Sequence, residues 1–194
     1  LGDVYKRQPN KIANTFKTVR KETLAPHTIA NYLSYMEDAF IIEKSIRYDI
    51  KGRKYIGTLA KYYFQDVGLR NALLNFRQVE ETHIMENIIY NELRSRGYSV
   101  DVGMIEARTA TERRQLEGDF VANKGDKRYY IQSAFALPNE EKREQELASL
   151  KRINDSFKKV IIMRDDISPY HDENGVLIMG LMDFLLGTNV EEIL

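Results

Sequence analysis

The chain has 194 residues and a formal net charge of zero, with 43% apolar and 30% charged residues. This composition is typical of a folded globular protein and excludes an intrinsically disordered chain. The chain has no cysteine, which excludes disulfide bonds and thiolate metal sites and agrees with a reducing compartment.

No segment of the sequence is suited to cross a membrane. The most apolar run, residues 176–186, is far shorter than the ~20 residues that a membrane-spanning helix needs, and it contains Asp183. The start of the chain lacks the apolar core and the cleavage site of a signal peptide. We therefore expect a cytoplasmic protein with no membrane partner.

The first eight residues look foreign to the protein. The letters "DVYKRQ", residues 3–8, resemble the in-frame translation of a sequencing adapter of the kind found at broken ends of metagenomic contigs. We expect residues 1–8 not to be native. The natural protein would then extend upstream of Pro9.

The zero net charge conceals two halves of opposite charge. Residues 9–78 contain 12 Lys or Arg and 6 Asp or Glu, whereas residues 79–194 contain 15 and 22. A basic half followed by an acidic half predicts two modules with different surfaces. We place the boundary between residues 78 and 79.

The first module reads as two helices and a hairpin. Apolar residues recur at helical spacing in residues 12–19 and again in residues 29–40, where Thr28 is the expected helix cap. Two strand-like segments then flank a turn at "KGRK", residues 51–54. This order predicts a winged helix-turn-helix over residues 9–65, followed by a short bridging helix.

The second module reads as a mixed α/β core with the order αβββαβ. A helix of about residues 80–95 ends at Gly97, and Ala107–Arg114 is expected to be a mobile loop. The remaining elements are three strands around residues 98–106, 115–123 and 127–136, a helix over residues 138–153, a buried strand in "KKVIIMRD" and a final strand and helix from residue 175.

Several stretches of the chain resemble a known family. These include "HTIANYLSYMEDAFIIEKSIRYDIKGR", "MENIIYNELRSRGYSVDVG" and "EGDFVANKGDKRYYIQSA". They are similar to the C-terminal domain of unknown function that follows an AAA-type ATPase domain in bacterial and archaeal proteins. The resemblance implies a winged helix joined to a core like that of PD-(D/E)XK nucleases. ATP and Mg²⁺ would belong to the ATPase domain, which is missing here, and we expect no cofactor in this chain itself.

The nuclease pattern is incomplete at the positions that match it. The resemblance places Glu86, Asp119 and Gln132 as the candidate metal ligands and Ala134 where a lysine belongs. An amide carries no charge to attract a cation, and a methyl group cannot assist the attacking water. A weak Mg²⁺ site and nuclease activity are therefore kept as alternatives. We expect a catalytically inactive core.

A substitute for the missing lysine must come from elsewhere in the chain. Lys127 lies on the wrong strand face, and Arg128 is about 20 Å along the strand from Ala134 at ~3.3 Å per residue. Lys142 and Arg143 on the following helix are the remaining candidates.

The wing carries the positive charge expected of a nucleic-acid contact. The candidate residues are Arg47, Lys51, Arg53 and Lys54, whereas the second helix contains no Lys or Arg. Contacts from the wing would be to phosphate groups and would depend strongly on salt. The alternative that we place slightly ahead is docking on an acidic protein surface, either the missing ATPase domain or the second module.

Overall fold

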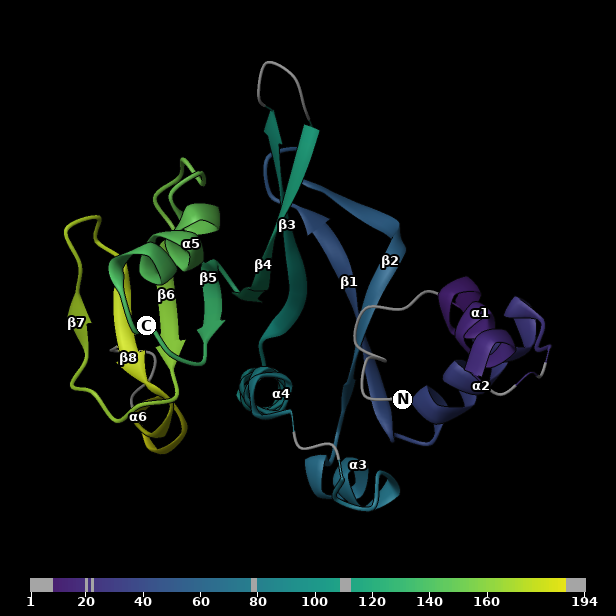
Figure 1. Cartoon of the computed structure of the whole chain (residues 1–194). Helices are drawn as coiled ribbons and strands as arrows, with labels where there is room; N and C mark the ends of the chain where they lie inside the picture. The colour runs from purple at the N-terminus through teal and green to yellow at the C-terminus, as the bar shows by residue number, and fades with distance from the viewer. Residues whose placement is uncertain (1–8, 20, 22, 78–79, 109–112, 188–194) are drawn as a thin grey trace. The chain divides into compact units, whose positions relative to one another are not determined.

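The computed structural model describes residues 9–19, 21, 23–77, 80–108 and 113–187, so residues 1–8, interpreted as a non-native leader, lie outside the described residues. The chain is a mixed α/β protein with six helices and eight strands in the described part (Figure 1). Two units are distinguished: unit 1 contains the residues up to Arg47 and Ile56–Glu80, and unit 2 contains Tyr48–Tyr55 and the residues from Glu81 onward. None of the helices among these residues has the length and apolar character needed to span a bilayer.

Unit 1 has the expected order of helix, helix, hairpin and short helix. Its elements are α1 (Pro9–Val19), α2 (Pro26–Asp38), the parts of β1 (Ile42–Asp49) and β2 (Lys54–Phe64) outside the hairpin tip, and α3 (Val67–Leu73). Buried side chains of α1, α2 and the hairpin form one small core, made of Ala13, Ile29, Leu33, Ile42 and Tyr62. The amphipathic spacing of these residues explains why the two helices pack on the hairpin.

The start of α2 differs from the sequence prediction. The helix is capped at Ala25, which makes no side-chain hydrogen bond, and not at Thr28. The Ala25 carbonyl accepts hydrogen bonds from the N–H groups of Thr28 and Ile29, at 3.0 and 3.3 Å. Pro26 occupies the first turn, where its fixed φ suits the helix and its missing N–H costs nothing.

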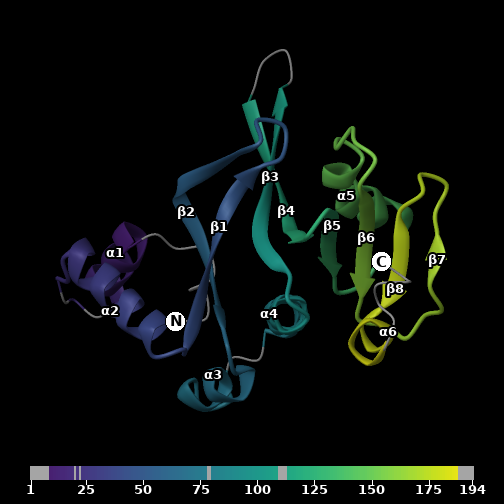
Figure 2. The ribbon, with the colours of Figure 1, turned by 180° about the vertical axis from the view of Figure 1, so that it is seen from behind.

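Unit 2 follows the expected αβββαβ order and extends it. Its elements are α4 (Glu81–Ser95), β3 (Ser99–Arg108), β4 (Arg113–Lys124), β5 (Lys127–Ala134), α5 (Glu140–Leu150), β6 (Lys158–Met163), β7 (Tyr170–His171), β8 (Leu177–Gly180) and α6 (Leu181–Leu186). Strands β3, β4 and β5 are antiparallel, β6 and β8 continue the sheet in parallel with β5, and β7 pairs antiparallel with β8. Strand β7 is the edge strand of the sheet and lies next to β8 (Figure 2).

Two boundaries in unit 2 differ from the expected ones. The ladder between β3 and β4 continues to the pair Arg108↔Arg113, so residues 107, 108, 113 and 114 of the expected loop belong to strands, and residues 109–112 lie outside the described residues. Helix α5 begins at Glu140 because Asn139 caps it, with its side chain accepting a hydrogen bond from the Lys142 N–H at 2.8 Å.

The two main helices of unit 2 pack on opposite faces of the sheet. Tyr90 of α4 contacts Phe120 of β4, with ring centroids 6.3 Å apart. Leu147 of α5 belongs instead to the core cluster of Val121. Gln132 of β5 is bonded to Glu146 of α5 and accepts a hydrogen bond from the Asp119 N–H, so Gln132 lies on the α5 face next to Asp119.

The tip of the β1–β2 hairpin belongs to unit 2, which shifts the domain division away from a single cut near residue 78. Ile50 is buried in the unit 2 core, and its N–H donates to the Met104 carbonyl at 3.0 Å. The Tyr55 hydroxyl donates to the Asp101 carboxylate at 3.2 Å. An apolar residue at the turn is buried here because the tip pairs with β3.

Candidate functional site

Asp119 on β4 and Gln132 on β5 lie side by side. The main-chain ladder between these strands runs from Lys124↔Lys127 to Phe120↔Ile131. At the next positions the main-chain N–H groups are bonded to side chains instead of to the opposite main chain. The Ser133 N–H donates to the Asp119 carboxylate at 2.9 Å, and the Asp119 N–H donates to Gln132 Oε1 at 3.4 Å. The two side chains therefore satisfy main-chain groups where the strands separate.

The amide of Gln132 connects the sheet to α5. Its Nε2 donates to Glu146 Oε2 at 3.1 Å, and Glu146 also forms an ion pair with Lys142 at 2.6 Å. A glutamine offers both an acceptor and a donor, so it can face a main-chain N–H on one side and a carboxylate on the other. A glutamate at this position would meet Glu146 with like charge.

The remaining positions of the nuclease pattern lie in the interior. Ala134 is 1% exposed and packs in the core cluster that also contains Leu147, Leu150 and Met163. Glu86 is buried on α4. Within the described ranges no three His, Cys, Asp or Glu side chains lie close enough to hold a metal ion. Metal binding by Glu86, Asp119 and Gln132 stays a prediction.

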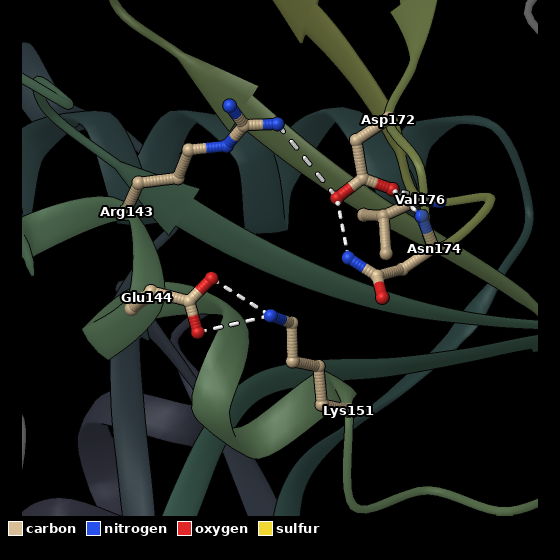
Figure 3. A network of polar contacts seen from close by, with 6 residues as sticks. All are labelled: Arg143, Glu144, Lys151, Asp172, Asn174 and Val176. Atoms are coloured by element: carbon tan, nitrogen blue, oxygen red, sulfur yellow. Dashed lines mark hydrogen bonds and ion pairs between the residues drawn. The ribbon is translucent and has the colours of Figure 1, made fainter. Parts of the chain in front are cut away.

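The two candidate replacements for the lysine are both engaged with carboxylates. Lys142 pairs with Glu146, as described above. Arg143 points toward Asp172 near the β7–β8 edge, with Nη2 3.9 Å from Oδ2 (Figure 3). Lys142 and Gln132 both contact the Glu146 carboxylate.

Asp172 organises the turn between β7 and β8. Its Oδ1 accepts hydrogen bonds from the N–H groups of Asn174 and Val176, at 2.9 and 2.8 Å (Figure 3). Burial raises the pKa of the Asp172 carboxyl, but these hydrogen bonds and the charge of Arg143 outweigh it and lower the pKa below its ordinary value of 3.8. The carboxylate form is therefore the one that the folded chain stabilises.

Replacing Asp172 with asparagine is expected to lower the free energy of unfolding by about 1–2 kcal/mol at pH 7, because hydrogen bonds to a charged acceptor are lost. A lowered pKa adds stability above the ordinary aspartate value, and this stability is lost as the pH falls through the folded-state value. The difference from wild type should thus shrink below pH 3.8. Urea unfolding at several pH values checks it, with the exposed neighbour Glu173→Gln as a control that leaves stability unchanged.

The four candidate nucleic-acid residues of the wing differ in exposure. Arg47 is buried at 9% exposure, whereas Lys51, Arg53 and Lys54 are exposed around the hairpin turn. Lys51 and Arg53 line an open pocket of about 660 Å³, which we call the turn pocket. Three further cations also line the turn pocket, and the sequence prediction did not assign them to the wing. They are Lys127, Arg128 and Arg152.

Arg128 is held in place by aromatic rings at the turn pocket. Its guanidinium carbon lies 5.2 Å from the centroid of Tyr48 and 5.4 Å from that of Phe157. Its Nε donates to Asn123 Oδ1 at 2.7 Å. A planar guanidinium packed against two rings keeps its charge and loses conformational freedom before any ligand arrives.

The chain is similar to one protein in sequence and to one solved structure, and its first part matches a family model. An uncharacterized protein of Haemophilus influenzae is 36% identical over 181 residues, which cover 92% of this chain and 41% of that protein. The chain thus spans less than half the length of this relative. The crystal structure of protein VC1899 from Vibrio cholerae covers 95% of this chain and 49% of its own, with 13% identity and a TM-score of 0.44. A family model described as a domain of unknown function (DUF8612) matches residues 5–80.

Proposed function

We propose that this chain is the C-terminal regulatory or docking part of a longer prokaryotic ATP-binding protein, and that its nuclease-like unit 2 is catalytically inactive. The observation that carries the second statement is the pair Asp119 and Gln132, whose side chains are bonded to main-chain N–H groups at the point where two strands separate. These bonds give both side chains a role in joining the strands, and the neutral amide of Gln132 adds no charge to attract a cation.

The proposed parentage rests on the family resemblance and agrees with the length of the relative. The Haemophilus influenzae protein has more than half of its length outside the aligned region. An upstream ATPase domain would be located there, and it would supply the site for ATP and Mg²⁺. In this proposal unit 1 is a winged helix, an assignment that its order of helix, helix and hairpin supports.

The catalytic part of the proposal predicts that the purified chain leaves nucleic acid intact. Incubation with Mg²⁺ or Mn²⁺ and single-stranded DNA, duplex DNA or RNA should give no more product than buffer alone on a denaturing gel. The Asp119→Ala variant, prepared in the same way, should behave identically. Cleavage by the wild-type chain that disappears in this variant would establish the competing function, a divalent-metal nuclease with Glu86, Asp119 and Gln132 as ligands.

The parentage is tested on the Haemophilus influenzae relative. Its part outside the aligned region should bind ATP, and addition of the present chain in trans should change the rate of ATP hydrolysis. Absence of ATP binding by the full-length relative would contradict the proposal. This outcome is independent of the nuclease assay, since an inactive core can belong to a protein without an ATPase.

A further inference from the structure

The turn pocket is formed by three separate segments of unit 2. They are the hairpin tip, the β4–β5 turn and the loop between α5 and β6, and the lining residues lie within residues 48–53, 123–128 and 152–157. Strands β5 and β6 are parallel, and Tyr129 pairs with Lys158. The segments that precede these two strands therefore lie at the same end of the strands. We propose that the turn pocket binds the sugar-phosphate backbone of single-stranded nucleic acid.

The charge of the turn pocket favours an anion. Five cationic side chains line it against two carboxylates, Asp126 and Asp155. Asp155 is already engaged, because it accepts hydrogen bonds from the Tyr130 hydroxyl at 2.6 Å and from the Phe157 N–H at 3.2 Å. The pocket therefore holds an excess of positive charge that internal carboxylates do not neutralise.

Three of the cations are exposed and remain available to a ligand. Lys51, Arg53 and Arg152 make no ion pair with any residue in the part of the chain that the structure describes. They come from two segments that are about a hundred residues apart in the sequence. Flexible exposed cations on both sides of a pocket can contact successive phosphates of one strand.

Arg128 adds a fixed contact at the wall of the turn pocket. The rings of Tyr48 and Phe157 hold its guanidinium in place, and among the described residues no carboxylate lies within ion-pair distance of it, although its charge acts on the Asp101 carboxyl. Arginine in such a position binds phosphate oxygens with defined geometry, since its planar group presents several N–H donors together. Phe157 is 39% exposed, and its ring offers a surface on which a base can stack.

The size and shape of the turn pocket favour a single strand over a duplex. Its volume of about 660 Å³ is that of a concave site for small ligands, and a few nucleotide units can enter it. A duplex presents a convex surface and is commonly read by a basic recognition helix in the major groove. Helix α2, which would have that role, contains no Lys or Arg.

The proposal is tested by fluorescence anisotropy with a labelled 12-residue oligothymidylate. The double variant Lys51→Ala plus Arg152→Ala should bind about tenfold more weakly at low salt. The slope of log K against log salt should fall by about 1.4, because each phosphate contact to a single strand contributes about 0.7. The matched control, Lys17→Ala plus Lys44→Ala, removes two exposed cations of unit 1 and should bind like wild type.

Competition with unlabelled anions shows which class of anionic ligand the turn pocket binds. An unlabelled oligothymidylate should displace the probe at far lower concentration than thymidine monophosphate, inorganic phosphate or polyglutamate of equal charge. Equal displacement by polyglutamate would overturn the proposal in favour of an acidic protein partner. Tighter binding of a duplex, an equal loss of affinity in the control variant, or no binding by wild type at low salt would also overturn it. Unchanged thermal unfolding of both variants excludes a loss of fold as the cause.

Discussion

Replacing Ala134 with lysine is expected to destabilise unit 2 by about 3 kcal/mol or more, although it restores the lysine of the nuclease pattern. The position is 1% exposed and lies in the apolar core beneath α5. An ammonium group placed there loses its hydration, and Gln132, two positions along the strand, is already bonded to Glu146. Urea or thermal unfolding of the purified variant measures the loss.

The variant Ala134→Met separates the effect of size from the effect of charge. Methionine is about as long as lysine and fills the same space, and overpacking alone costs about 1–3 kcal/mol. The lysine variant should be less stable than the methionine variant by about 2 kcal/mol at pH 7, since burial lowers a lysine pKa by several units. Equal stability of the two variants would show that the core opens to water at this position.

The pH dependence of this difference has a defined sign. A lysine whose folded-state pKa lies below its ordinary value of ~10.4 destabilises the fold in its charged form. The penalty is therefore complete below the folded-state pKa and decreases as the pH rises toward ~10.4. A difference that stays constant between pH 7 and pH 10 would mean that the ammonium reaches solvent.

The element order of unit 2 was predictable because its signals are local. Gly97, with φ of +84°, ends α4, and Gly125, with φ of +61°, forms the turn between β4 and β5. Strand β7 was missed because a two-residue exposed strand has no apolar pattern, and only its pairing with β8 defines it.

The roles of the site residues could not be predicted in the same way. The family resemblance led us to expect a carboxylate at position 132, but it could not show that the amide there donates to Glu146, fourteen residues away. The turn pocket depends on contacts of longer range still. Arg128 was judged only by its distance from Ala134, whereas its position between Tyr48 and Phe157 follows from the folded arrangement of three segments.

Replacing Gln132 with glutamate is the second change with a large expected effect. The new carboxylate would face Glu146 in place of an amide that now donates to it at 3.1 Å. We expect the free energy of unfolding to fall by about 2–3 kcal/mol at pH 7, from the lost hydrogen bond and the repulsion of two like charges. Lys142 already pairs with Glu146 and can compensate only one of the two charges.

Acid should abolish this destabilisation, because repulsion raises the folded-state pKa of one carboxyl above its ordinary value of ~4.3. The penalty is present above the folded-state pKa and disappears as the pH falls below ~4.3, where both states are protonated. The exchanged pair, Gln132→Glu with Glu146→Gln, should recover most of the stability at pH 7, since one amide and one carboxylate again face each other. If the single variant is as stable as wild type at pH 7, the amide does not determine how β5 is joined to α5, and the site is open enough to hold the carboxylate of an active nuclease.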